Sequence, residues 1–129
     1  MAKYLLDTQI FIWANQEPTK IPNSIKRILS QNHHTFYLSM ASIWEMQIKI
    51  QLDKLQLKPN LSTALKIIQD KGIYEILPIT QTHILNLQTL EFHHKDPFDR
   101  MIISQAMCEH LTVLTVDSEI VKYPIECIS

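Results

Sequence analysis

The sequence contains a single glycine, Gly72, among its 129 residues. The phosphate-binding loops of dinucleotide-binding and Walker-type proteins need several glycines within a few residues of one another. One glycine therefore excludes both kinds of loop. It also excludes the G-x-S-x-G turn that exposes the nucleophilic serine of the α/β-hydrolases.

Cysteine is almost as scarce, and the two present, Cys108 and Cys127, form no C-x-x-C pair. A disulfide framework, a zinc ribbon and a thioredoxin-type site are therefore poorly supported, and the reducing cytosol is the expected compartment. Long apolar runs are lacking too. No stretch approaches the ~18 residues of a membrane-spanning helix, and the run at Tyr4–Leu6 is too short for a signal peptide. We expect a cytoplasmic protein with no membrane partner.

An excess of charge of either sign is also missing. Lys plus Arg total 12 and Asp plus Glu total 13, so the formal net charge is -1. A strongly basic protein that coats DNA is therefore not expected. Hydrophobic residues make up 46% and charged residues 19%, which is enough apolar side chain for a buried core. This length is typical of one domain, and we expect residues 1–129 to form it.

Segments rich in β-forming residues alternate with segments of helical periodicity. Strands are predicted at 3–6, 35–39, 73–79 and 111–116, with a fifth, edge strand at 125–128. Helices are predicted at 10–14, 25–29, 40–52, 61–71, 82–90 and 97–109. This alternation predicts an α/β domain whose mainly parallel central sheet of about five strands is flanked by helices. In such sheets, sites form beyond the carboxyl ends of the strands.

Acidic residues occupy several of those positions. Asp7 follows the first predicted strand, Asp117 follows the fourth, and Asp99 lies in the first turn of a helix. Glu45 lies within the helix that follows the second strand. Aspartate is also a favoured helix cap, so capping explains Asp7 and Asp117 as well as a functional role does.

Capping does not explain why Glu45 and Asp99 share their helical sides with apolar residues. The residues on the same helical side as Glu45 are Ala41, Ile48 and Leu52, and those that share a side with Asp99 are Ile102, Ile103 and Ala106. A buried carboxylate is costly unless it has a partner. We therefore expect Glu45 to be at least half buried, and we expect Asp99 to point inward as a metal ligand would.

Carboxylates that converge on one pocket repel each other, and a divalent cation removes the repulsion. Oxygen ligands suit Mg²⁺ or Mn²⁺, and zinc is the weaker choice because thiolates and clustered histidines are lacking. Such a site activates water for in-line displacement at phosphorus. The pairs His33-His34 and His93-His94 lack metal-ligand spacing, and we assign both to loops. For His93 and His94, a phosphate contact or proton transfer is the alternative.

With their neighbours, these acids resemble the PIN domain, in its VapC-type branch of bacterial toxin–antitoxin pairs. The matching segments occur in the family's order at 5–8, 39–45, 48–49, 54–55, 94–100 and 114–117. The block Asp96-Pro97-Phe98-Asp99-Arg100, continued by residues 101–106, is the most specific. Gln9, where many members carry histidine, and Asp53, where glycine is frequent, depart from the pattern.

The resemblance implies a PIN fold and a metal-dependent endoribonuclease whose acidic site is formed by four residues: Asp7, Glu45, Asp99 and Asp117. By the same analogy, Asp7 and Asp99 would bind Mg²⁺ or Mn²⁺ most directly. Glu45 and Asp117 would act through water or hold the attacking water. An RNA substrate, an antitoxin that covers the groove and a homodimer are implied as partners.

Four further residues of the matching segments are expected to support the site. The resemblance implies that Thr8 and Thr115 do so through hydroxyl hydrogen bonds. We interpret Asp96 as the cap of the helix that begins at Pro97. We interpret Arg100 as structural as well, through an ion pair or a phosphate contact.

Other classes of function fit less well. An aspartyl-nucleophile phosphatase commonly needs a second aspartate two residues after the first, where this chain has Gln9. A receiver-like signalling module needs an aspartate after the middle strand, where Thr80 and Gln81 stand. A PIN domain that binds RNA with weak or no catalysis and without a toxin role stays open, although the complete set of four acids argues against it. Lysines such as Lys49 are candidates to line an RNA groove.

Overall fold

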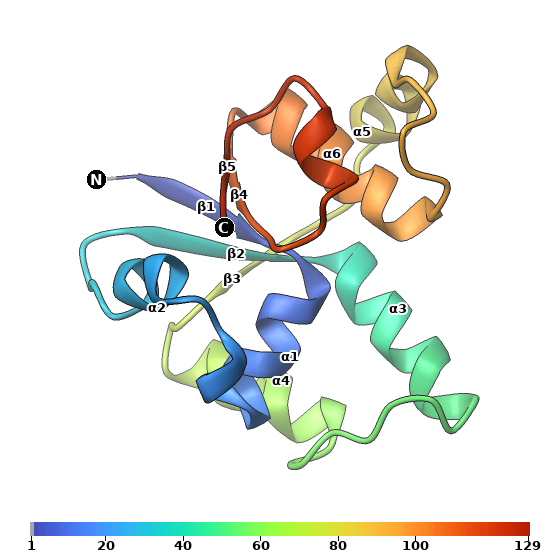
Figure 1. Ribbon diagram of the computed structural model, residues 1–129. Helices are drawn as coiled ribbons and strands as arrows, with labels where there is room; N and C mark the ends of the chain where they lie inside the picture. Colours follow the sequence, from blue (N-terminus) through green and yellow to red (C-terminus); the bar gives the residue numbers. More distant parts are fainter. Residues whose placement is uncertain (1) are drawn as a thin grey trace.

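A five-stranded sheet forms the centre of the computed structural model, which describes residues 2–129 (Figure 1). The strands are β1 (Lys3–Leu6), β2 (Thr35–Ser39), β3 (Glu75–Leu77), β4 (Thr112–Leu114) and β5 (Cys127–Ile128). They lie in the order β3-β2-β1-β4-β5, and every neighbouring pair is parallel. The predicted α/β class with a five-stranded, mainly parallel sheet is confirmed.

Across residues 2–129, six α-helices connect and flank the strands. They are α1 (Thr8–Gln16), α2 (Asn23–Leu29), α3 (Met40–Gln51), α4 (Leu61–Asp70), α5 (Gln81–Asn86) and α6 (Pro97–Glu109). Three short 3₁₀ helices accompany them: η1 (Pro18–Lys20), η2 (Leu87–Thr89) and η3 (Ile120–Lys122). Within the described residues, no helix has both the length and the apolar character needed to cross a membrane.

The differences from the predicted boundaries have local causes. The strand predicted at 73–79 is shortened to β3, and Pro78, which follows it, has no N–H with which to continue the ladder. Leu111 does not join β4 because its N–H bonds the carbonyl of Ala106 and closes the end of α6. The helix predicted at 82–90 ends at Asn86 and continues as η2.

Both faces of the sheet are buried. In β1, Tyr4 and Leu6 belong to one core cluster, which includes side chains of α1, α2 and α4. Leu5, which points to the other face, packs in a second cluster with residues of α6, β4 and η3. A parallel sheet that is covered on both faces explains why its strands are nearly continuous apolar runs.

The strand order creates a switch point between β1 and β4. From β1 the chain builds outward to β2 and β3, and it then returns to the other side of β1 for β4 and β5. The loops that leave the carboxyl ends of β1 and β4 therefore run in opposite directions and leave a crevice between them. This crevice is the usual ligand site of an open parallel sheet. Asp7 directly follows β1, and its N–H bonds the carbonyl of Leu114 at the end of β4.

Candidate acidic metal site

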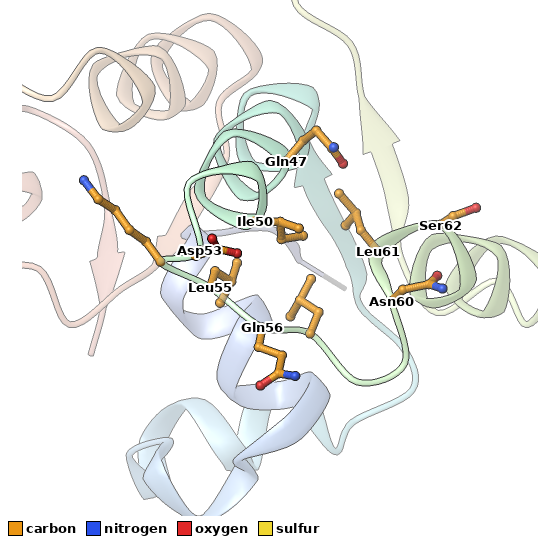
Figure 2. A pocket seen from close by; sticks show the side chains of 10 residues that line it. Gln47, Ile50, Asp53, Leu55, Gln56, Asn60, Leu61 and Ser62 are labelled. Atoms are coloured by element: carbon orange, nitrogen blue, oxygen red, sulfur yellow. The ribbon is translucent and has the colours of Figure 1, made fainter.

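The four predicted acids line one pocket of about 320 Å³ at this switch point. Each comes from a different part of the fold: Asp7 from the end of β1, Glu45 from α3, Asp99 from α6 and Asp117 from the loop after β4. Thr8, Lys49 and Asp96 also line the pocket. A larger hollow of about 810 Å³ lies beside the end of α3 and the start of α4 (Figure 2), and its lining contains none of the four acids.

Asp7 both caps a helix and faces the pocket. Its Oδ1 atom accepts a hydrogen bond of 2.6 Å from the N–H of Gln9 and so caps α1, while Oδ2 accepts one from the Thr115 hydroxyl. The side chain is buried, and burial raises its pKa, although the two hydrogen bonds oppose that rise. The two interpretations of Asp7, as cap and as site residue, are therefore compatible.

Glu45 has one oxygen paired and one orphaned. Its Oε2 atom receives a 2.8 Å ion pair from the ammonium of Lys49, one helical turn away. Its Oε1 atom is buried and has no hydrogen-bond partner among residues 2–129. The residue is only 5% exposed, so the predicted burial is confirmed. A buried carboxylate oxygen without a donor is costly, and a bound cation or an ordered water would satisfy it.

Among the four acids, Asp99 is the one whose ionised form is most strongly disfavoured. Its pKa is raised to about 7, first by burial and then by the negative charges of Asp96, Asp7 and Glu45. The repulsion that the sequence predicted is thus present in the folded pocket. A divalent cation would oppose it by stabilising the ionised carboxylate.

Asp117 is held by main-chain groups of its own loop. Its Oδ1 atom accepts hydrogen bonds from the N–H groups of Glu119, at 2.7 Å, and Ile120, at 3.3 Å. Burial alone would raise the pKa of Asp117, but these bonds and a hydrogen bond from His94 outweigh it and lower the pKa. Unlike Asp99, this carboxylate is set up to stay ionised.

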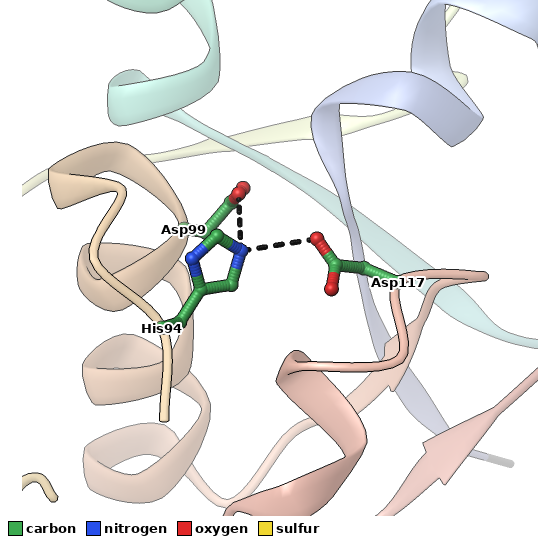
Figure 3. A group of neighbouring side chains, drawn as sticks. All are labelled: His94, Asp99 and Asp117. Atoms are coloured by element: carbon green, nitrogen blue, oxygen red, sulfur yellow. Dashed lines mark hydrogen bonds and ion pairs between the residues drawn. The ribbon is translucent and has the colours of Figure 1, made fainter. Parts of the chain in front are cut away.

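His94 is a site residue that the sequence analysis assigned to a loop. It does lie in a loop, but its Nε2 atom is 2.9 Å from Oδ2 of Asp99 and 3.0 Å from Oδ2 of Asp117 (Figure 3). Burial would lower its pKa, yet the hydrogen bond to Asp117 and the surrounding carboxylates raise it. His93, in contrast, pairs with Glu91 at 3.0 Å and is a loop residue as expected.

The supporting residues divide into those that contact the acids and those that do not. Asp96 caps α6 as expected, because its Oδ1 atom accepts from the N–H groups of Phe98 and Asp99. Thr115 holds Asp7. The buried Thr8 hydroxyl instead donates to Ser42 at 2.8 Å, so it ties α1 to α3 and bonds none of the four acids.

Arg100 has a structural role, as expected, but not through the ion pair that we predicted. Its guanidinium is buried and forms no ion pair within the described residues. It donates instead to the main-chain carbonyls of the segment before α6, those of Leu87, Leu90, Glu91 and His94, and to the Tyr123 hydroxyl. The Phe92 ring lies 4.3 Å from its guanidinium carbon. Arg100 therefore organises the segment before α6.

The donor set of the pocket fits a hard divalent cation. Four carboxylates converge, one of them is strongly destabilised as an anion, and another has a buried oxygen with no hydrogen-bond partner in the described part of the chain. Carboxylate oxygens are the ligands that Mg²⁺ and Mn²⁺ prefer, which makes Asp7, Glu45, Asp99 and Asp117 the residues able to hold such an ion.

The fold and the pocket define an α/β protein with an acidic site at the carboxyl edge of its parallel sheet. The PIN domain family model matches residues 4–126, and the chain belongs to that family. A comparison with curated proteins found no match.

Solved structures share the fold over nearly the whole chain. A chain of VapBC2 from Rickettsia felis, bound to a promoter DNA fragment, is 20% identical with a TM-score of 0.74, covering 98% of this chain and 97% of that one. A chain of DNA-bound VapBC from Salmonella typhimurium is 20% identical with a TM-score of 0.71 (99% and 98% covered). A chain of VapBC-1 from nontypeable Haemophilus influenzae is 18% identical with a TM-score of 0.69 (98% and 97% covered).

Proposed function

We propose that this protein is a metal-dependent endoribonuclease and the toxin of a toxin–antitoxin pair. The observation that carries the nuclease proposal is the pocket of four carboxylates with the unpartnered Oε1 atom of Glu45. The toxin role is supported by the VapBC complexes among the structures that share the fold.

Each acid has a distinct part in this proposal. Asp7 and Asp99 would hold Mg²⁺ or Mn²⁺ directly, and Glu45 and Asp117 would act through water. When bound, the ion lowers the pKa of water and stabilises negative charge on the phosphate. Lys49 fixes Oε2 of Glu45, which leaves Oε1 to accept a hydrogen bond from the attacking water. The Thr115 hydroxyl holds Oδ2 of Asp7 in the same way.

The proposed partners are RNA, a cognate antitoxin and a second copy of this chain, all in the cytoplasm. An aromatic pair lies beside the pocket: the exposed Trp44, which is next to Glu45, packs edge-to-face on the partly buried Phe98, which is next to Asp99. Exposed tryptophan is a frequent anchor of protein interfaces. This pair is a surface that an antitoxin or a second copy would cover.

Purified protein, freed of any copurified antitoxin, should cleave a mixture of tRNA and mRNA when Mg²⁺ or Mn²⁺ is present. Cleavage should stop in EDTA and return when metal is restored, because the acids alone neither activate water nor balance the phosphate charge. Gel analysis of the RNA measures both effects. A folded, metal-binding protein that retains RNA without cutting it would favour the alternative of a weakly catalytic, RNA-binding PIN domain.

Mn²⁺ should raise the melting temperature of the protein, and more so at pH 8 than at pH 5.5. An ion at 100 times its Kd stabilises the fold by about 2.7 kcal/mol, or roughly 10 °C for a domain of this length. With the pKa of Asp99 raised to about 7, the carboxyl is mostly protonated at pH 5.5 and must lose its proton to bind metal. Differential scanning fluorimetry gives the shift, and an equal shift at both pH values would contradict this account.

A further inference from the structure

His94 closes a hydrogen-bonded ring within six residues of sequence. Its Nδ1 atom accepts a bond of 3.2 Å from the N–H of Asp96. The Asp96 carboxylate in turn accepts from the N–H of Asp99, at 3.0 Å. The Asp99 carboxylate lies 2.9 Å from the Nε2 atom of His94. The same Nε2 atom reaches Asp117, which comes from the other side of the switch point (Figure 3).

The ring fixes which nitrogen of His94 carries the proton. A main-chain N–H is only a donor, so Nδ1, which faces the N–H of Asp96, must be an acceptor and carries no hydrogen. In the neutral imidazole the hydrogen is then on Nε2, between the two carboxylates. Nε2 therefore acts as a donor to Asp99 and Asp117.

His94, Asp99 and Asp117 offer ligand atoms that all lie within 4.8 Å of one another. The tautomer decides whether His94 binds a metal ion in this group or orients the two carboxylates. A histidine that binds a metal through Nε2 needs that atom unprotonated and normally donates from Nδ1. Here Nδ1 meets a donor instead, so the ring has the wrong polarity for a ligand. The Nε2 atom of His94 contacts only Oδ2 of each carboxylate, which leaves Oδ1 of Asp99 for another partner.

We propose that His94 is a positioning residue for the metal site, which holds Asp99 and Asp117 together through its Nε2–H and is not itself a metal ligand. This inference rests on the proposed metal-dependent function. The position of His94 is set on both sides: its N–H donates to the Tyr123 hydroxyl at 2.8 Å, and its carbonyl accepts from Arg100 at 3.3 Å. The imidazole is thus carried by a fixed main chain, as a side chain that orients ligands must be.

Two substitutions separate the donor from the rest of the side chain. His94→Gln can place an amide N–H near the position of Nε2, whereas His94→Asn can accept from the N–H of Asp96 but is too short to bridge the carboxylates. Isothermal titration with Mn²⁺ should show Kd raised about 10- to 100-fold in the Asn variant, the usual cost of losing a group that orients metal ligands. The Gln variant should recover most of this loss. His93→Ala, a neighbour bonded to Glu91, should bind Mn²⁺ as the parent does.

Pulsed electron paramagnetic resonance of the Mn²⁺-loaded parent tests the role directly. We expect no coupling to a directly bound imidazole nitrogen, and a ¹⁴N coupling that disappears in His94→Asn would overturn the assignment. Equal Mn²⁺ affinity in the parent and in a folded Asn variant would also overturn it. A parent protein that binds no Mn²⁺ would instead refute the proposed metal-dependent function on which this inference rests.

Discussion

Replacing Asp99 by asparagine should lower the rate of RNA cleavage by more than about 100-fold, because a direct metal ligand matters at least as much as the groups that orient ligands. The asparagine side chain has nearly the same size but lacks the charge that offsets the cation. The initial rate of cleavage at saturating Mn²⁺, compared with the parent, measures the effect. Asp7→Asn should behave alike, since Asp7 is the other acid proposed to bind the ion directly.

The same substitution should stabilise the metal-free fold. The pKa of Asp99 is about 7 in the folded protein against a reference value of 3.8, so the folded state binds the proton more tightly than the unfolded chain. Its contribution to stability is fully present below the reference value and is lost as the pH rises through 7. An asparagine at this position has no proton to lose. In EDTA at pH 8 the melting temperature of the Asp99→Asn variant should exceed that of the parent by roughly 5 °C, and the gap should shrink toward pH 4.

Asp70→Asn is the matched control, because Asp70 is an exposed aspartate at the end of α4, outside the pocket lining. It should change neither the cleavage rate nor the melting temperature. An Asp99→Asn variant that is folded and cleaves as fast as the parent would show that the acidic pocket is not the site of chemistry. An Asp99→Asn variant that is inactive but no more stable than the parent would agree with the acidic pocket as the site of chemistry. It would contradict the claim that the charge of Asp99 destabilises the metal-free fold.

The sequence predicted the elements of the fold well because each depends on local pattern. The helical periodicity of α3 and α6 and the apolar runs of β1 and β4 are visible in single segments. Strand order is not visible in this way, since it depends on which buried faces pack together. The switch point beside β1 therefore became known only from the structure, although the acids after the strands already indicated where to look.

The parts of the site that the sequence analysis missed depend on main-chain groups. His94 gains its role from an N–H of Asp96 and from a loop that approaches it in space, and neither has a signature in residue spacing. The available signals were its position two residues before the capping aspartate and its place at the start of the matching segment 94–100. The backbone also shows why glycine is frequent at one position where this chain departs from the family pattern. Asp53 has a φ of 55°, a conformation that glycine adopts at less cost.

The partner of Arg100 was predicted wrongly for a related reason. Charged side chains are rarely buried unless they are paired, so an arginine beside an acidic motif suggests a salt bridge or a surface contact. Its actual partners are carbonyl oxygens, which every residue possesses and no sequence pattern reveals. The buried guanidinium therefore holds the main chain from η2 to His94, and its removal should be felt throughout that segment.

Replacing Arg100 by methionine should destabilise the fold by about 3 kcal/mol, or roughly 10 °C in melting temperature. Methionine keeps much of the aliphatic stem but removes every donor, which leaves the carbonyls of Leu87, Leu90, Glu91 and His94 without their arginine partner. The stability of Arg100→Lys should lie between those of the parent and of Arg100→Met. An ammonium has three donors but lacks the planar fork that spans separate carbonyls. Thermal and urea unfolding of the metal-free protein give both values.

The same variant distinguishes a structural from an RNA-binding Arg100. The exposed Arg27 of α2 provides the control, and Arg27→Met should leave stability nearly unchanged. Arg100 donates a hydrogen bond to the carbonyl of His94. The Arg100→Met variant should therefore also bind Mn²⁺ more weakly while it is still folded, at a temperature well below its melting point. RNA affinity that falls in Arg100→Met with no loss of stability would instead restore the phosphate contact suggested by the sequence. A loss of stability together with weaker Mn²⁺ binding would show that this arginine supports the acidic site through the loop it holds.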